Sequence, residues 1–327
     1  MTKRTLDGLL WRQRFITQLG CIKAGLEYMG RDISFPWLYG GAGYGFVINI
    51  QETLDPSGPT CWDTQMLFDL APNLGYKVSG FSIEKAEAGE AFPEKQRQAW
   101  DFVRASLDHG LPCYGWELHP YIPDYYIING YDDGEDGNPA GYFYSGWISG
   151  GPRDWRTLGD TDVKVLQVYS IELVEPAPDK KVVKDALTTV IQHSASPSGW
   201  FSHSGYASGP AGFDLWAEAL ETGRAIRDGH SYNAISWLEC REMVVGFLHE
   251  ARQKLPGCCE ASFEEAIDHY TAVCAQLRVA LSLNPFRPEI WDNATRLQSA
   301  EVAILMRQAG ASERRALECL RNIVVSL

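Results

Sequence analysis

The feature that most constrains the fold is a change in sequence texture at residues 174–180, VEPAPDK. Before this point, short helix patterns alternate with apolar strand patterns and glycine-rich turns, whereas almost every later segment has helical periodicity. Two prolines end a strand pattern here, and Asp179 can cap the helix that follows. A chain of 327 residues is long enough for two cores. We therefore predict two domains, residues 1–177 and residues 178–327.

In the first predicted domain, helices dominate the beginning and strands follow. Periodicity predicts helices over 21–29, 61–74 and 94–109, and strands over 111–118, 125–131, 141–147 and 163–174. The segment DDGEDGN joins two of these strands and has the composition of a turn in an antiparallel hairpin. Helices followed by an antiparallel sheet indicate an α+β fold rather than a doubly wound α/β fold.

The second predicted domain is an all-α helical bundle. Helix patterns cover 179–193, 209–223, 230–254, 262–282, 288–309 and 312–326, and Gly310 separates the last two. The apolar stripes of these helices would also allow a homodimer.

Charge and hydropathy exclude several classes of partner. The net charge is −13, and no run of lysines or arginines offers a surface for phosphates, so we expect no nucleic-acid binding and no binding to anionic membranes. The first 15 residues mix charges with apolar residues, unlike a signal peptide, and no segment approaches the roughly 18 apolar residues of a membrane span. These features predict a cytoplasmic protein.

The cysteine and histidine patterns predict neither a metal site nor a cofactor site. The eight cysteines form no CxxC pair, and the histidines form no HExxH motif, so we expect free thiols, most of them buried. The glycine-rich segment GGAGYG, residues 40–45, lacks the downstream GK[ST] of a phosphate-binding loop. Its glycines instead predict a sharp turn or a close approach of two backbones.

Cys21 is the first candidate nucleophile. It lies at the predicted start of a helix, where the helix dipole lowers a thiol pKa, and Gln18 could donate a hydrogen bond to an oxyanion. The alternative is a buried, unreactive cysteine. Cys61, which precedes Trp62 at another predicted helix start, is a weaker candidate because no glutamine stands upstream at the right spacing.

Three segments resemble papain-like cysteine peptidases. QLGCIKAGLEYMG, residues 18–30, is similar to the nucleophile helix of the bacteriocin-processing type, and PDYYIINGYDDG, residues 123–134, resembles its histidine strand. WLYGGAGYGFVINI, residues 37–50, is more similar to the N-terminal domain of butirosin biosynthesis protein H. The resemblance covers about residues 10–175. It implies a papain-like N-terminal domain with a helical C-terminal extension, and acyl chemistry on a small amide or thioester.

The resemblance puts the family's catalytic histidine at Asp124 or Tyr125, where this chain has no histidine. A carboxylate is a poor base for a thiol unless its pKa is raised. The candidate bases are therefore His119 from a nearby loop, His203 from the segment before the helices, or Asp124 with a raised pKa.

Two functions follow from these residues. In one, Cys21 performs hydrolysis or acyl transfer on a small substrate. In the other, the site is degenerate and the domain binds a small molecule or a protein in an aromatic pocket near Cys21, Trp37, Asp124 and Tyr125. Both functions predict that the Cys21 sulfur faces an open cleft between its helix and the sheet.

Overall fold

A computed structural model describes residues 3–134, 139–195, 205–290 and 294–327. The fold is mixed α and β, and it divides into two compact units, each of which combines two stretches of the chain. Unit 1 contains residues 1–33 and 75–175, and unit 2 contains residues 34–74 and 176–327. The break at 175/176 lies close to the predicted boundary at 177. The segment 34–74, however, belongs to unit 2, whereas the sequence assigned it to the first domain.

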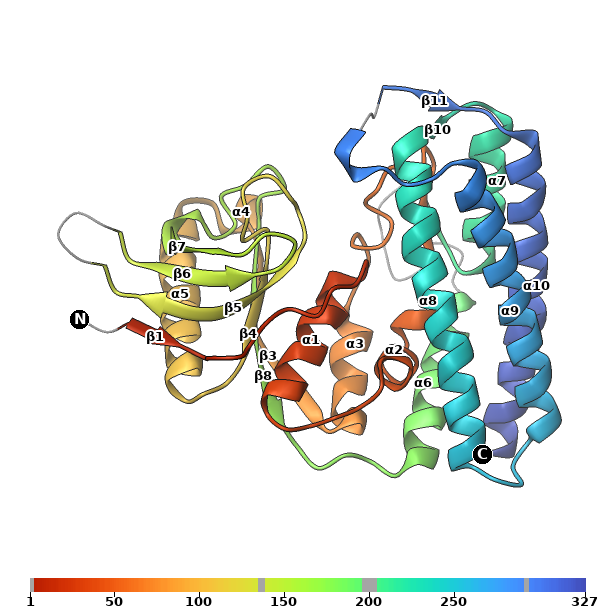
Figure 1. Cartoon of the computed structure of the whole chain (residues 1–327), viewed down its shortest axis with the longest axis horizontal. Helices are drawn as coiled ribbons and strands as arrows, with labels where there is room; N and C mark the ends of the chain where they lie inside the picture. The colour runs from red at the N-terminus through yellow and green to blue at the C-terminus, as the bar shows by residue number, and fades with distance from the viewer. Residues whose placement is uncertain (1–2, 135–138, 196–204, 291–293) are drawn as a thin grey trace. The chain divides into compact units, whose positions relative to one another are not determined.

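Unit 1 is built on an antiparallel sheet with the strand order β3-β8-β4-β5-β6-β7, and β1 pairs with the far end of β5 (Figure 1). The helices α1 and α5 pack against this sheet. In chain order, the elements are β1 (Lys3–Thr5), α1 (Thr17–Tyr28), β3 (Tyr76–Glu84), α4 (Lys85–Ala88), η3 (Gly89–Ala91), α5 (Phe92–Asp108), β4 (Cys113–Trp116), β5 (Tyr125–Asp132), β6 (Gly141–Ser145), β7 (Gly150–Asp154), η4 (Trp155–Thr157) and β8 (Val165–Leu173).

The sheet of unit 1 forms where apolar and aromatic residues alternate or run together. β4 is buried along its whole length, and the predicted hairpin is present as β5 and β6, paired from Ile127↔Ser145 to Asp132↔Gly141. The helix α5 buries one stripe that includes Ala99, Val103 and Leu107, and Gly110 follows it in a left-handed conformation. The edge strands β3 and β7 were not predicted. β7 has the sequence GGPRD, which carries no strand signal.

Unit 2 is mainly helical, and α8, α9 and α10 run side by side (Figure 1). Its elements are α2 (Phe35–Gly41), η1 (Tyr44–Phe46), β2 (Asn49–Gln51), α3 (Gln65–Leu70), η2 (Ala71–Leu74), α6 (Asp179–Ser194), β9 (Tyr206–Ser208), α7 (Pro210–Glu221), β10 (Ala225–Ile226), α8 (Arg227–Lys254), α9 (Glu260–Leu283), η5 (Pro288–Ile290), β11 (Arg296–Leu297) and α10 (Ala300–Ser326). No helix in the described ranges is long and apolar enough to cross a membrane.

The segment 34–74 belongs to unit 2 because α8 buries it. A Cβ on Gly40 would lie 2.0 Å from Cγ of Phe247, so only glycine lets α2 approach α8 this closely. The Arg241 guanidinium, which is fully buried, donates to the carbonyl oxygens of Gly45 and Val47 at 2.9 and 2.7 Å. The glycine-rich segment therefore serves a close backbone approach, as the sequence predicted.

The helix α10 continues through Gly310, where the sequence predicted a break between two helices. A Cβ at this position would lie 3.0 Å from the Cβ of Phe213 in α7. Because α7 packs against α10, Gly310 provides space for a neighbouring helix and does not end its own.

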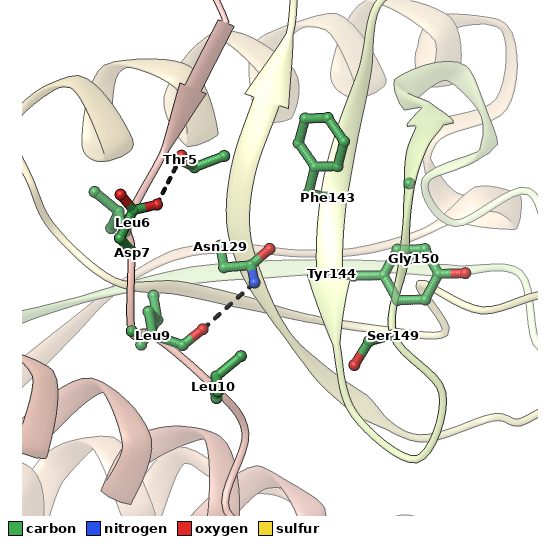
Figure 2. A pocket seen from close by; sticks show the side chains of 12 residues that line it. Thr5, Leu6, Asp7, Leu9, Leu10, Asn129, Phe143, Tyr144, Ser149 and Gly150 are labelled. Atoms are coloured by element: carbon green, nitrogen blue, oxygen red, sulfur yellow. Dashed lines mark hydrogen bonds between the residues drawn. The ribbon is translucent and has the colours of Figure 1, made fainter.

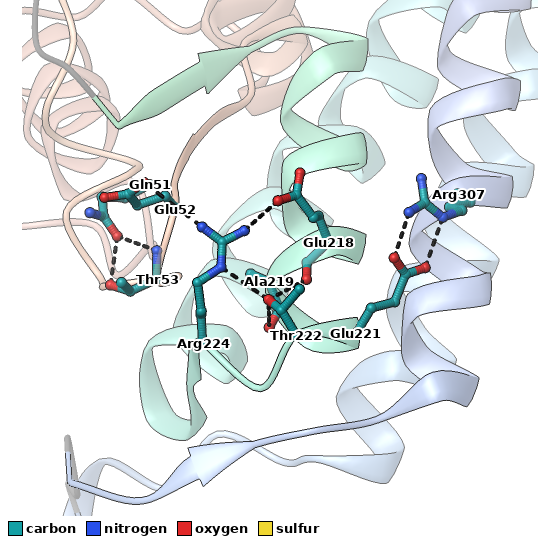
Figure 3. A network of polar contacts seen from close by, with 9 residues as sticks. All are labelled: Gln51, Glu52, Thr53, Glu218, Ala219, Glu221, Thr222, Arg224 and Arg307. Carbon is teal, nitrogen blue, oxygen red and sulfur yellow. Dashed lines mark hydrogen bonds and ion pairs between the residues drawn. The ribbon is translucent and has the colours of Figure 1, made fainter.

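A surface network of charged residues links β2, α7 and α10 within unit 2 (Figure 3). Arg224 donates to Glu218 at 2.6 Å and lies 3.9 Å from Glu52, while Arg307 and Glu221 form two hydrogen bonds of 2.9 and 2.7 Å. Because these side chains are partly or largely exposed, the ion pairs of this network add little to the free energy of unfolding.

Candidate functional site

The first residue of α1 is Thr17, and not Cys21 as the sequence predicted. Thr17 lies 2% exposed, and its hydroxyl donates a hydrogen bond to Oδ1 of Asp124, which immediately precedes β5. The backbone N–H of Tyr125 in turn donates to the Thr17 hydroxyl at 3.1 Å. The first residue of α1 is therefore a threonine, and it is hydrogen-bonded to Asp124, the position at which the resemblance expects a histidine.

The Asp124 carboxyl is buried and receives hydrogen bonds from several directions. Trp147, in the segment after β6, donates from Nε1 to Oδ2 at 2.9 Å, and the N–H of Tyr125 donates to Oδ1 at 3.3 Å. Burial is the largest effect on this group and raises the pKa of Asp124 to about 7, against the lowering effect of these donors. Near neutral pH the group is consequently divided between its neutral and charged forms.

Cys21 lies one turn further into α1 and is fully buried, with 0% of its surface exposed. Burial raises the pKa of its thiol well above the ordinary value, and the charge of Asp124 raises it further. Its charge would in turn raise the pKa values of Tyr114 in β4 and Tyr126 in β5, so these two tyrosines lie near the thiol. The predicted open cleft at this sulfur is wrong, because the Cys21 side chain is fully buried.

The predicted helpers of Cys21 are buried in the same layer. Gln18 is 3% exposed and lies beside Tyr114. Tyr125 is 6% exposed, packs edge-on against Trp116, and donates from its hydroxyl to Gln167 at 2.7 Å. These residues form the packed interior of unit 1 and do not line a substrate cleft.

His119 is surrounded by aromatic side chains of unit 1. His119 packs among Tyr121, Tyr126 and Tyr144, and burial together with Arg153 lowers its pKa. Its described contacts do not include the Cys21 thiol.

Trp37 belongs to unit 2, where it packs on Phe247 under the ammonium group of Lys254. His203 lies outside the described residues. Cys61, also in unit 2, is half-buried, and burial raises the pKa of its thiol, contrary to what a nucleophile requires.

A hollow of about 540 Å³ opens elsewhere in unit 1, across β1, β5 and β6 (Figure 2). The segment Thr5–Leu10 forms one wall, and the turn Ser149–Gly151 lies at the opposite side. Asn129 of β5 lies in the middle and donates from its amide to the Leu9 carbonyl at 3.4 Å. Leu10 is 55% exposed at the rim, which gives the hollow an apolar edge open to solvent.

Strands β1, β5 and β6 are closely packed beside this hollow. Thr5, Gly130 and Phe143 stand in one row across the three strands. A Cβ on Gly130 would lie 2.5 Å from the Arg4 carbonyl oxygen, 3.0 Å from Cγ2 of Thr5 and 3.2 Å from Cδ2 of Phe143, so glycine allows β1 and these side chains to approach β5 closely. Lys3 lies over the outer part of the same region, with its Nζ 4.9 Å from the Phe143 ring centre.

Sequence reasoning missed Thr17, Trp147 and the hollow. The signal for Thr17 was its hydroxyl directly before the apolar helical stripe, at the position where helices commonly begin. Among the described residues, no group of three or more His, Cys, Asp or Glu side chains could hold a metal ion. No protein-family model matches the chain, and no curated protein matches it.

Proposed function

We propose that unit 1 is a papain-like module without cysteine chemistry, and that it binds a small molecule or a peptide in the hollow across β1, β5 and β6. One observation carries this proposal: the Cys21 sulfur is fully buried and its pKa is raised, so neither access nor a thiolate is provided. The papain-like assignment is supported by a leading helix packed on an antiparallel sheet, with its first residue hydrogen-bonded to the residue that precedes β5.

Native alkylation tests the absence of cysteine chemistry. Iodoacetamide should label the partly exposed Cys258 and Cys259 of the folded protein, which serve as internal positive controls, and should label Cys21 only after denaturation. If iodoacetamide labelled Cys21 in the native state, and the labelling rate reached half its maximum below about pH 8.5, Cys21 would again be a candidate nucleophile.

Ligand binding in the hollow is tested with an apolar fluorescent probe, anilinonaphthalene sulfonate. The change Leu10→Ser removes the exposed apolar rim, and it should weaken probe binding without altering the fold. Leu283→Ser in α9 is the matched control, because Leu283 is 45% exposed on unit 2. Equal binding by the wild type and both variants would place the probe elsewhere and remove the support for this hollow.

A second function has separate support in the Thr17–Asp124 pair. A hydroxyl that donates to a carboxyl of pKa about 7, at a helix start, is the arrangement of a nucleophile with its base. Acyl hydrolysis would then proceed through an ester on Thr17. We rank this function second because Thr17 is only 2% exposed.

The test is hydrolysis of p-nitrophenyl acetate. Under this second function, Thr17→Ala abolishes turnover, whereas Cys21→Ala and Ser149→Ala retain it. Equal background rates in all three variants would reject it.

A further inference from the structure

Two adjacent cysteines lie in the turn between α8 and α9 of unit 2. The Sγ atoms of Cys258 and Cys259 are 3.1 Å apart, and both residues are partly exposed. Neighbouring side chains in regular structure point in different directions, to opposite faces of a strand or about 100° apart around a helix. Two converging thiols at consecutive positions therefore require a special backbone.

The special backbone is the left-handed conformation of Cys259, with φ of 52°. Few residues other than glycine adopt this conformation, because it crowds Cβ against the main chain. Hydrogen bonds hold the turn on both sides: the N–H of Cys258 donates to Leu255 O at 3.2 Å, and the N–H of Phe263 donates to Cys259 O at 3.0 Å. These bonds fix the backbone on both sides of the pair, and the two sulfurs lie close together without a ligand.

The start of α9, a lysine of α6 and the end of α10 surround the pair. Cys259 is the N-cap of the 24-residue helix α9, whose dipole places partial positive charge beside the sulfurs. The neighbouring Cys259 thiol and burial raise the pKa of Cys258 above its ordinary value, and Lys180 of α6 offsets only part of this effect. The backbone oxygen of Ser326, near the end of α10, lies 3.9 Å from the Cys258 sulfur and bounds the site on another side.

The separation of the sulfurs selects the geometry of the ligand. With metal–sulfur bonds of about 2.3 Å, a linear two-coordinate ion holds its sulfurs about 4.6 Å apart, and a tetrahedral ion holds them about 3.8 Å apart. A pyramidal centre with angles near 90° brings them to about 3.3 Å. The 3.1 Å separation fits the pyramidal centre best. We propose that the Cys258–Cys259 pair is a two-thiolate binding site for a trivalent, thiophilic centre such as an organic arsenical.

Phenylarsine oxide is the probe for this site. Two As–S bonds form and the As=O bond breaks, while the oxygen leaves as water with the two thiol protons, so arsenic keeps its oxidation state. Intact mass spectrometry of the full chain should show one adduct, with the mass of the reagent less one water. Because both sulfurs bind one centre, the adduct should withstand excess 2-mercaptoethanol and yield to a small dithiol.

Single substitutions separate a paired site from ordinary thiol reactivity. Cys258→Ser and Cys259→Gly should each lose the adduct, and glycine retains the left-handed backbone at position 259. Cys61→Ser, which removes another partly exposed thiol, should keep it. The proposal is overturned if either pair variant retains the adduct against 2-mercaptoethanol, if Cys61→Ser loses it, or if the wild type binds only after denaturation. Circular dichroism of each variant checks that the helices are intact.

Discussion

The indole Nε1 of Trp147 donates a 2.9 Å hydrogen bond to Oδ2 of Asp124, while the Thr17 hydroxyl donates to the other carboxyl oxygen. Trp147 follows β6, Thr17 opens α1, and Asp124 precedes β5, so this one carboxyl joins three parts of unit 1. Because this buried carboxyl accepts hydrogen bonds from two other segments, it helps to hold these segments together. Its ionisation therefore changes the free energy of unfolding.

The stability of unit 1 should fall as pH rises from about 4 to 7. The fold raises the pKa of Asp124 from its ordinary 3.8 to about 7, so the fold favours the neutral carboxyl. This contribution is fully present below pH 3.8, decreases between pH 3.8 and pH 7, and is lost above pH 7. At about 1.4 kcal/mol for each pKa unit, it amounts to about 4 kcal/mol.

The measurement is urea unfolding of wild type and Asp124→Asn between pH 4 and 8. Asparagine reproduces the neutral carboxyl, since its oxygen can accept from Trp147 and its amide can donate to Thr17. The two proteins should be similar at pH 4, and the variant should be the more stable at pH 8. Asp162→Asn, at an exposed carboxylate, is the control for other titrating groups. A stability gap that does not change with pH would contradict the raised pKa.

Cys21→Ser should affect stability and leave binding at the hollow unchanged. The serine hydroxyl would be placed at a fully buried position, which costs about 1–3 kcal/mol when the hydroxyl lacks a partner. Cys61→Ser, at a half-buried thiol, should cost less. Guanidinium unfolding measures both variants. A loss of activity without a loss of stability in Cys21→Ser would instead indicate a chemical role.

The sequence predicted the elements of this fold better than their grouping. The central strands were located because their apolar and aromatic runs are bounded by turn residues, as in Cys113–Trp116 and Tyr125–Asp132. The assignment of residues 34–74 to unit 2 rests on the contact between Gly40 and Phe247, which lie far apart in the chain. Periodicity contains no information on such a pair.

The candidate site was predicted in part for the same reason. The resemblance directed attention to Asp124 and to the helix that precedes it in the chain, because both have local sequence signals, and the structure joins them through the hydrogen bond from Thr17. It selected Cys21 on residue type, whereas the structure begins the helix at Thr17, four residues earlier. Helix ends are the least reliable part of a sequence prediction, and a shift of one turn is enough to change which residue contacts Asp124.

Glu313→Gln should strongly destabilise unit 2. The Arg241 and Glu313 side chains are 0% and 2% exposed and form two hydrogen bonds of 3.1 and 2.8 Å. Glutamine would leave the arginine charge buried without a counter-charge, at a cost of about 3–5 kcal/mol. Glu221→Gln, which breaks the exposed pair with Arg307 (Figure 3), is the matched control and should not measurably change the unfolding midpoint. If Glu313→Gln and Glu221→Gln changed the unfolding midpoint equally, water would reach the Arg241 charge, and the predicted cost of leaving it buried would be wrong.

Gly40→Ala should lower the stability of unit 2, and a smaller residue at position 247 should partly restore it. The new Cβ would overlap the ring of Phe247, with a closest approach of 2.0 Å before relaxation, and overpacking of this kind costs about 1–3 kcal/mol. Phe247→Ala alone leaves a cavity and costs about 3–5 kcal/mol. In the double variant the alanine methyl group enters that cavity, so the combined loss should be smaller than the sum of the two single losses. Thermal unfolding of the four proteins completes the cycle. Strict additivity would show that α2 moves away from α8 in Gly40→Ala, and that the close approach of these helices is not what holds residues 34–74 in unit 2.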